Sequence, residues 1–157
     1  MESNEKLIFE EGKIYFFICY ALVCGGKSTF FEQIISQTSK EETKEKYNVS
    51  FVSSDEIRSQ LTHDLQNKNK DMSFQTCFDK VGKTTAKEFD KQIQNAINNK
   101  QENKINIILV DKNYPNGIDK FLSLFCKDKN NQYFIILTPN IKKPINLNHL
   151  WFFNIWS

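Results

Sequence analysis

Four short apolar runs are spread along the chain, and they restrict the possible folds more than any other feature. They cover residues 14–24, 47–56, 105–113 and 132–139. Each run is rich in β-branched or aromatic residues and is flanked by polar ones, which is typical of parallel strands buried on both faces. The first run is about half as long as the ~20 residues that a membrane helix needs. We therefore predict four strands and no membrane span.

The segments between these runs carry apolar residues at steps of three and four, as the buried face of a helix does. The predicted helices follow residue 29, follow Asp55, extend over residues 73–99, and occupy a short stretch near residue 120. Their apolar stripes consist of Phe30, Phe31, Ile34 and Ile35; of Ile57, Leu61 and Leu65; of Phe74, Phe78, Val81, Phe89, Ile93 and Ile97; and of Ile118, Phe121, Leu122 and Phe125. Alternating strands and helices predict an α/β fold, a mostly parallel sheet of about four strands covered by helices.

Length and charge limit the organisation further. A chain of 157 residues with a net charge of +2 fits a single domain. This balance excludes a protein that holds duplex DNA by bulk electrostatics, although local contacts to a nucleic-acid end stay open. We expect the domain to span residues 1–139. Residues 140–157 form an irregular aromatic segment, which is a packed tail, a partner-binding segment or the truncated end of a longer protein.

The cysteines and histidines predict neither a zinc site nor a disulfide framework. None of the four cysteines forms a C-x-x-C pair, and His63 and His149 lie far apart in the sequence. The residues before the first apolar run are acidic, unlike a secretory signal. An intracellular location, cytoplasmic or nuclear, is the simplest expectation.

The first predicted strand runs directly into a lysine-containing loop. The residues concerned are Cys24, Gly25, Gly26, Lys27, Ser28 and Thr29. A phosphate-binding loop of the form G-x-x-x-x-G-K-[ST] uses backbone N–H groups and the lysine to hold phosphates and the hydroxyl to hold Mg²⁺. Its first glycine is replaced here by Ala21. The position between a strand and an amphipathic helix favours a nucleotide site over a purely structural turn.

Polar residues also follow the second and third predicted strands. Asp111 ends the third strand, where an aspartate either binds Mg²⁺ or caps the following turn. Asp55 follows the second strand and could accept a proton from an acceptor hydroxyl, with Arg58 on the same side of the next helix to bind a phosphate. The alternative is that Asp55 is a helix N-cap and Arg58 a surface residue. Ligands bind at this edge of open α/β sheets.

The motifs "ALVCGGKST", "VSSDEIR" and "VDKN" together resemble the 5′-hydroxyl polynucleotide kinases of the P-loop superfamily, and most of all the kinase domain of fungal-type tRNA ligases. In that domain alanine also takes the first glycine position, and Gly-Cys-Gly-Lys closes the loop. Here Ala21 is kept, and the Gly-Cys order is reversed in Cys24 and Gly25. The resemblance extends over residues 14–139.

The resemblance implies a P-loop NTPase three-layer sandwich that uses ATP or GTP with Mg²⁺. It implies that residues 24–29 bind the nucleotide, with Lys27 also catalytic, and that Ser28 and Asp111 hold the metal. Asp55 would be the general base toward an RNA 5′-hydroxyl, such as a tRNA exon, and Arg58 would contact the acceptor phosphate.

The sequence departs from this family after Pro139. Family members continue with a lid whose arginines contact the transferring phosphates, and then with a fifth strand. Here Arg58 is the only arginine of the chain. The domain is therefore expected to be incomplete before its lid and last strand. Two alternatives stay open, a P-loop module that binds nucleotide or a partner without catalysis and a kinase of small molecules.

Overall fold

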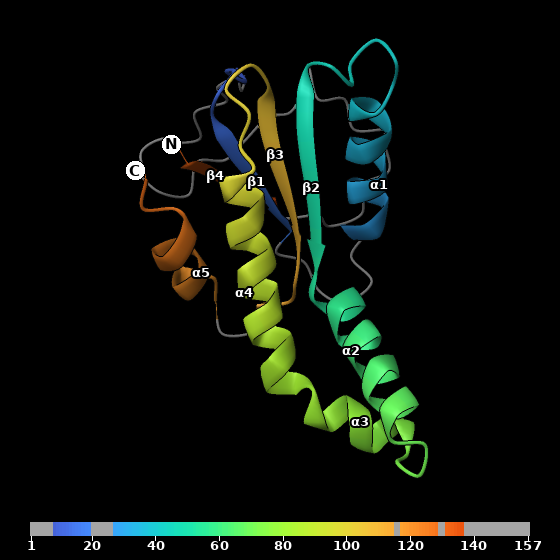
Figure 1. Ribbon diagram of the computed structural model, residues 1–157. Helices are drawn as coiled ribbons and strands as arrows, with labels where there is room; N and C mark the ends of the chain where they lie inside the picture. The colour runs from blue at the N-terminus through green and yellow to red at the C-terminus, as the bar shows by residue number, and fades with distance from the viewer. Residues whose placement is uncertain (1–7, 20–26, 115–116, 129–130, 137–157) are drawn as a thin grey trace.

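A computed structural model describes residues 8–19, 27–114, 117–128 and 131–136, and it shows strands alternating with helices (Figure 1). The elements are β1 (Ile14–Cys19), α1 (Lys27–Thr38), β2 (Tyr47–Ser53), α2 (Ser54–Lys68), α3 (Phe74–Lys80), α4 (Gly82–Asn98), β3 (Ile105–Asp111), α5 (Asp119–Phe125) and β4 (Asn131–Ile136). The four predicted strands are all present. The run at 14–24 forms a strand only to Cys19, and residues 20–26 and the expected tail at 140–157 lie outside the described residues.

The strands form one open parallel sheet in the order β2-β3-β1-β4. In its centre β1 pairs with β3, with Ile14 opposite Asn106 and Ile18 opposite Val110. Parallel neighbours need crossover connections, which the intervening helices supply. The predicted α/β class is thus confirmed.

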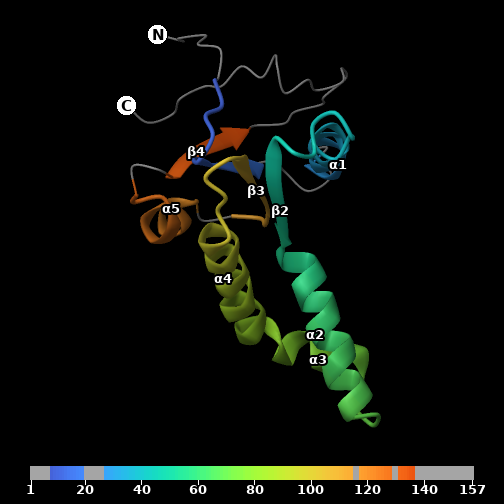
Figure 2. The same cartoon turned by 45° about the horizontal axis from the view of Figure 1, so that its top comes forward.

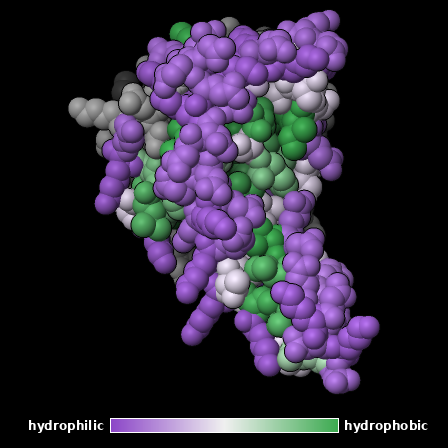
Figure 3. Space-filling model, in the orientation of Figure 1, coloured by the Kyte–Doolittle hydropathy of each residue, from purple (hydrophilic) through white to green (hydrophobic). Residues whose placement is uncertain are grey.

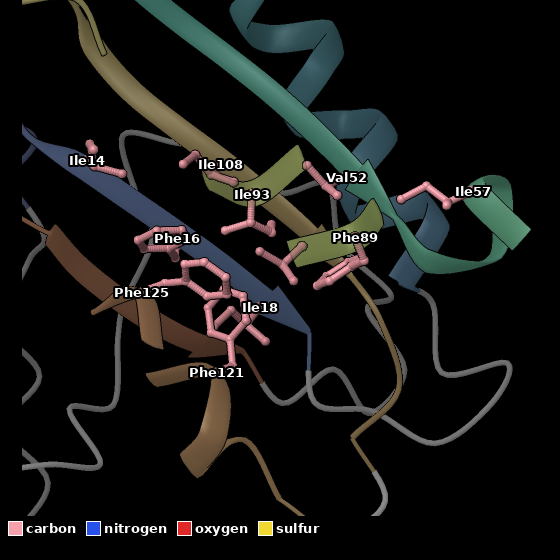
Figure 4. Packing of buried hydrophobic residues seen from close by; sticks show 11 residues of the cluster. Ile14, Phe16, Ile18, Val52, Ile57, Phe89, Ile93, Ile108, Phe121 and Phe125 are labelled. Carbon is pink, nitrogen blue, oxygen red and sulfur yellow. The ribbon is translucent and has the colours of Figure 1, made fainter. Parts of the chain in front are cut away.

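Helices cover both faces of this sheet. Side chains of a strand alternate between its faces, so Tyr15 and Phe17 of β1 pack with α1, whereas Phe16 and Ile18 pack with α4 and α5. Figure 4 shows this second cluster, in which aromatic side chains of α5 lie against β1. Phe16 and Phe121 meet edge to face, with ring centroids 5.6 Å apart. Each face therefore has its own apolar core.

The central strands β1 and β3 are buried along nearly their whole length, as predicted for strands enclosed on both faces. The strand β2 lies at an edge of the sheet, and four of its positions are only half-buried. Within the described residues, no helix combines the length and apolar character needed to cross a bilayer.

The helices α2 and α3 and the beginning of α4 extend beyond the carboxyl ends of the strands as a projecting arm (Figures 1 and 2). The outer surfaces of α2 and α4 are largely hydrophilic, and hydrophobic side chains gather between them (Figure 3). The arm therefore stands next to the edge of the sheet where the predicted site residues are found.

The expected single helix over residues 73–99 is wrong, because the chain turns at Val81 and forms α3 and α4 instead. In a continuous helix the carbonyl of Phe78 would accept the N–H of Gly82. Here that carbonyl accepts two N–H groups of Arg58, at 3.2 and 2.9 Å. Glycine also has a low helix propensity, which makes position 82 a favourable place to interrupt the helix.

Candidate functional site

The edge formed by the carboxyl ends of the strands is the candidate site. At this edge β1 leads towards α1 on one face of the sheet, while its neighbour β3 leads to α5 on the other face. Connections that leave neighbouring strands in opposite directions open a crevice between them, and ligands of open α/β sheets bind in such crevices. The chain order thus places the crevice between β1 and β3.

Asp111 lies at this crevice. It is the last residue of β3, next to Val110, whose partner in β1 is Ile18. The hydroxyl of Ser53, at the end of β2, donates a hydrogen bond to the carboxylate Oδ2 of Asp111 at 3.3 Å. Ser53 is buried and Asp111 is half-buried. The strand ends therefore bring a fixed, partly desolvated carboxylate to the crevice.

The lysine-containing loop is only partly covered by the structure. Cys24, Gly25 and Gly26 and the side chain of Lys27 lie outside the described residues. The helix α1 begins at Lys27, at the carboxyl edge of the sheet (Figure 1). Ser28 and Thr29 are exposed in its first turn. The N-terminus of a 12-residue helix faces this edge, and unpaired N–H groups at such an end favour an anion.

Asp55 lies in the first turn of α2 and is exposed. The N-cap of this helix is Ser53, whose hydroxyl accepts the backbone N–H of Glu56 at 3.4 Å. The alternative that Asp55 is the N-cap is therefore wrong. Its carboxylate stands at the sheet edge, where the positive end of the helix dipole stabilises it.

Arg58 is held by the arm. Besides its two bonds to the carbonyl of Phe78, its guanidinium lies over the Phe78 ring, 3.6 Å from the centroid. It thereby joins α2 to the end of α3. These bonds point the guanidinium towards α3. The predicted contact of Arg58 with an acceptor phosphate stays a prediction.

Replacing Arg58 with lysine is expected to lower the free energy of unfolding by about 1–2 kcal/mol, because lysine keeps the charge but loses the forked contact and the stacked plane. Urea denaturation measures this loss. The exposed Lys68 of the same helix provides the control, and Lys68→Met is expected to change stability by less than ~0.5 kcal/mol. Equal stability of Arg58→Lys and wild type would show that the contact with Phe78 does not hold the arm.

The described residues contain no group of three or more metal-ligating His, Cys, Asp or Glu side chains. A nucleotide-bound Mg²⁺ does not need such a group, since phosphate oxygens and waters fill most of its coordination positions. The two predicted ligands, Ser28 and Asp111, offer the hard oxygen donors that suit this ion.

A cavity next to the site was not predicted from the sequence. It has a volume of about 340 Å³ and lies between α4, α5 and the segment after β3. Phe89 of the predicted helical stripe and Lys112 of the "VDKN" motif line it, together with Tyr114. In the sequence, the only indication of a binding site here was the lysine, asparagine and tyrosine that follow Asp111. The cavity itself becomes visible only when α4 packs beside them.

Comparison with known proteins finds no matching family model, and neither the curated proteins nor the solved structures contain a significantly similar chain.

Proposed function

We propose that the chain is a P-loop kinase domain that transfers the γ-phosphate of ATP or GTP to the 5′-hydroxyl of an RNA end. The observation that carries the proposal is the meeting of three parts at one sheet edge. The helix α1 begins there within the GKST sequence, Asp111 ends the neighbouring strand β3, and Asp55 lies in the first turn of α2. Phosphoryl transfer needs these three functions, which are binding of phosphates, placement of a metal ion and activation of the acceptor.

The phosphates of the donor would lie at the N-terminus of α1, with Lys27 balancing their charge. Ser28 and Asp111 would hold Mg²⁺, which when bound neutralises charge on the β- and γ-phosphates. The bond from Ser53 orients Asp111 for this task. A carboxylate fixed in this way loses little further freedom when it binds.

Asp55 would take the proton of the acceptor 5′-hydroxyl. The hydroxyl oxygen forms a bond to the γ-phosphorus, while the bond from that phosphorus to the β–γ bridging oxygen breaks and the nucleoside diphosphate leaves. Asp55 is exposed at the sheet edge and so is accessible to an acceptor. The RNA end and the tRNA-splicing role rest only on the resemblance carried by "ALVCGGKST", "VSSDEIR" and "VDKN".

Nucleotide binding tests the phosphate loop directly. Titrating ATP or GTP with Mg²⁺ into the protein in a calorimeter is expected to show saturable binding, and Lys27→Ala is expected to weaken it about 30-fold, because a charge-assisted contact of about 2 kcal/mol is lost. Lys40→Ala, just beyond the end of α1, provides the matched control and should bind like wild type. Absence of binding by the wild-type protein would overturn the proposal.

A nucleotide-binding module without catalysis is the second candidate. It is favoured by Arg58, the only arginine of the chain, whose guanidinium is engaged by Phe78 rather than directed to the sheet edge. Stabilisation of charge on the transferring group usually depends on an arginine or a comparable cation. Nucleotide binding without transfer from labelled ATP or GTP to a 5′-hydroxyl oligonucleotide would identify this case.

A further inference from the structure

The cavity between α4 and α5 has the size and walls of a binding site for a flat aromatic ligand. Its volume of about 340 Å³ lies near the lower end of the ~300–1,000 Å³ that small-molecule sites occupy. Phe89, Tyr114 and Phe121 supply aromatic surface, and Figure 4 shows Phe89 and Phe121 on the sheet face that α4 and α5 cover. Aromatic walls favour a ligand that can stack.

Polar groups among these rings suit the edge of a nucleobase and a phosphate beside it. The ammonium of Lys112 lies 4.7 Å from the ring centroid of Phe89 and 5.5 Å from that of Tyr114. Asp90 and Asn113 also line the cavity and can accept or donate hydrogen bonds to base atoms. A lysine held over aromatic rings is positioned to bind a phosphate with little loss of side-chain entropy.

The hydroxyl of Tyr114 adds an independent observation. Tyr114 lines the cavity, and its hydroxyl oxygen is buried without a hydrogen-bond partner among the described residues. Burial raises the pKa of this phenol far above its ordinary value, and the charge of Asp90 raises it further, so the group stays a neutral donor. An unsatisfied buried hydroxyl costs free energy that a bound ligand can recover.

The place of the cavity in the fold indicates which ligand it takes. Lys112 directly follows Asp111, so the cavity adjoins the candidate site on the α4 and α5 face, whereas α1 belongs to the opposite layer. Attacking and leaving oxygens stand on opposite sides of the transferred phosphorus. With the donor phosphates at α1, the acceptor would approach from the side of this cavity.

We infer that the cavity lined by Phe89, Lys112 and Tyr114 binds the nucleobase of the acceptor's 5′-terminal nucleoside. This inference rests on the proposed function, because it takes the acceptor to be a nucleic-acid end. It adds a specificity site to a reaction centre that by itself would recognise only a hydroxyl.

Filling the cavity tests the inference. Ala86 is an exposed residue of α4 that lines the cavity, so Ala86→Trp can occupy it without disturbing the core. Calorimetry with a 5′-hydroxyl RNA trinucleotide, in the absence of donor, is expected to show at least tenfold weaker binding than wild type. The same substitution at exposed Thr84, which does not line the cavity, provides the control and should stay within twofold.

A trinucleotide that lacks the 5′-terminal base gives the second measurement. Wild type should bind it at least tenfold more weakly than the complete trinucleotide, whereas Ala86→Trp should bind both equally. Equal binding of the two RNAs by wild type, an unaffected Ala86→Trp variant, or no binding of RNA by wild type would each overturn the inference. So would an equal loss of ATP and GTP binding in Ala86→Trp, which would assign the cavity to the donor. The titration of ATP or GTP into wild type and Lys27→Ala tests the proposed function independently of these RNA measurements.

Discussion

Asn106→Leu is expected to destabilise the protein by about 3 kcal/mol, because it removes a buried amide that joins the amino ends of three strands. Asn106 is 3% exposed and lies near the beginning of the inner strand β3. Its amide nitrogen lies 2.9–3.1 Å from the carbonyls of Lys13, Gln101 and Lys104, which share its two N–H groups as acceptors. Its oxygen accepts from the Asn48 amide and from the N–H of Gln101, both at 2.9 Å. Leucine has a similar volume but can make none of these bonds.

The hydrogen bonds lost with the amide explain the size of the effect. The carbonyl of Lys104 keeps a bond from Gly12, and that of Lys13 keeps the backbone N–H of residue 106. The carbonyl of Gln101 also keeps a bond, from the N–H of Lys104, so the N–H of Gln101 and the Asn48 amide are the groups that lose a partner. The several hydrogen bonds lost, at a net ~0.5–1.5 kcal/mol each, together account for the expected effect. Urea denaturation followed by circular dichroism measures the change in the free energy of unfolding.

Asn48→Ala separates this network from a general effect of losing an amide. Asn48 donates to Asn106 and to the carbonyl of Asn99, but it is only half-buried, so water can replace its bonds. We expect a loss of about 1 kcal/mol. Equal losses in Asn48→Ala and Asn106→Leu would contradict the claim that burial of the Asn106 network decides its effect.

This asparagine also shows why the sequence predicts the strands better than their connections. The apolar runs identify β1 and β3, because strands enclosed on both faces must be apolar almost throughout. The order of strands in the sheet depends on contacts between distant segments. Asn106 lies inside such a run, and nothing in its neighbours indicates that it bonds to residues 13 and 48.

The helical arm shows the same limit. An apolar stripe continues from Phe74 to Ile97 and predicts one helix. At the turn at Val81, the carbonyl of Phe78 is taken by Arg58, which lies 20 positions before Phe78 in the sequence. The cavity likewise needs α4 and α5 to meet beside Lys112. The carboxyl edge could be predicted, because parallel strands necessarily end at one side of the sheet.

Asp55→Asn is expected to lower the rate of phosphate transfer to a 5′-hydroxyl RNA about 10³-fold, because an amide cannot accept the proton of the attacking hydroxyl. The substitution keeps the shape of the side chain at the first turn of α2. Ser53 caps the helix in both proteins, so folding should be little affected. The measurement is transfer from γ-labelled ATP or GTP to a 5′-hydroxyl oligonucleotide under saturating nucleotide.

The neighbouring Glu56 supplies a matched control within the same turn. It is also acidic and exposed, so Glu56→Gln removes the same charge from the same end of the helix dipole. If Asp55 acts as the base, Glu56→Gln should keep transfer within about threefold of wild type, and nucleotide binding should be unchanged in both variants. Equal losses in the two variants would attribute the effect to the field at the helix end, and full activity of Asp55→Asn would assign the proton to another acceptor.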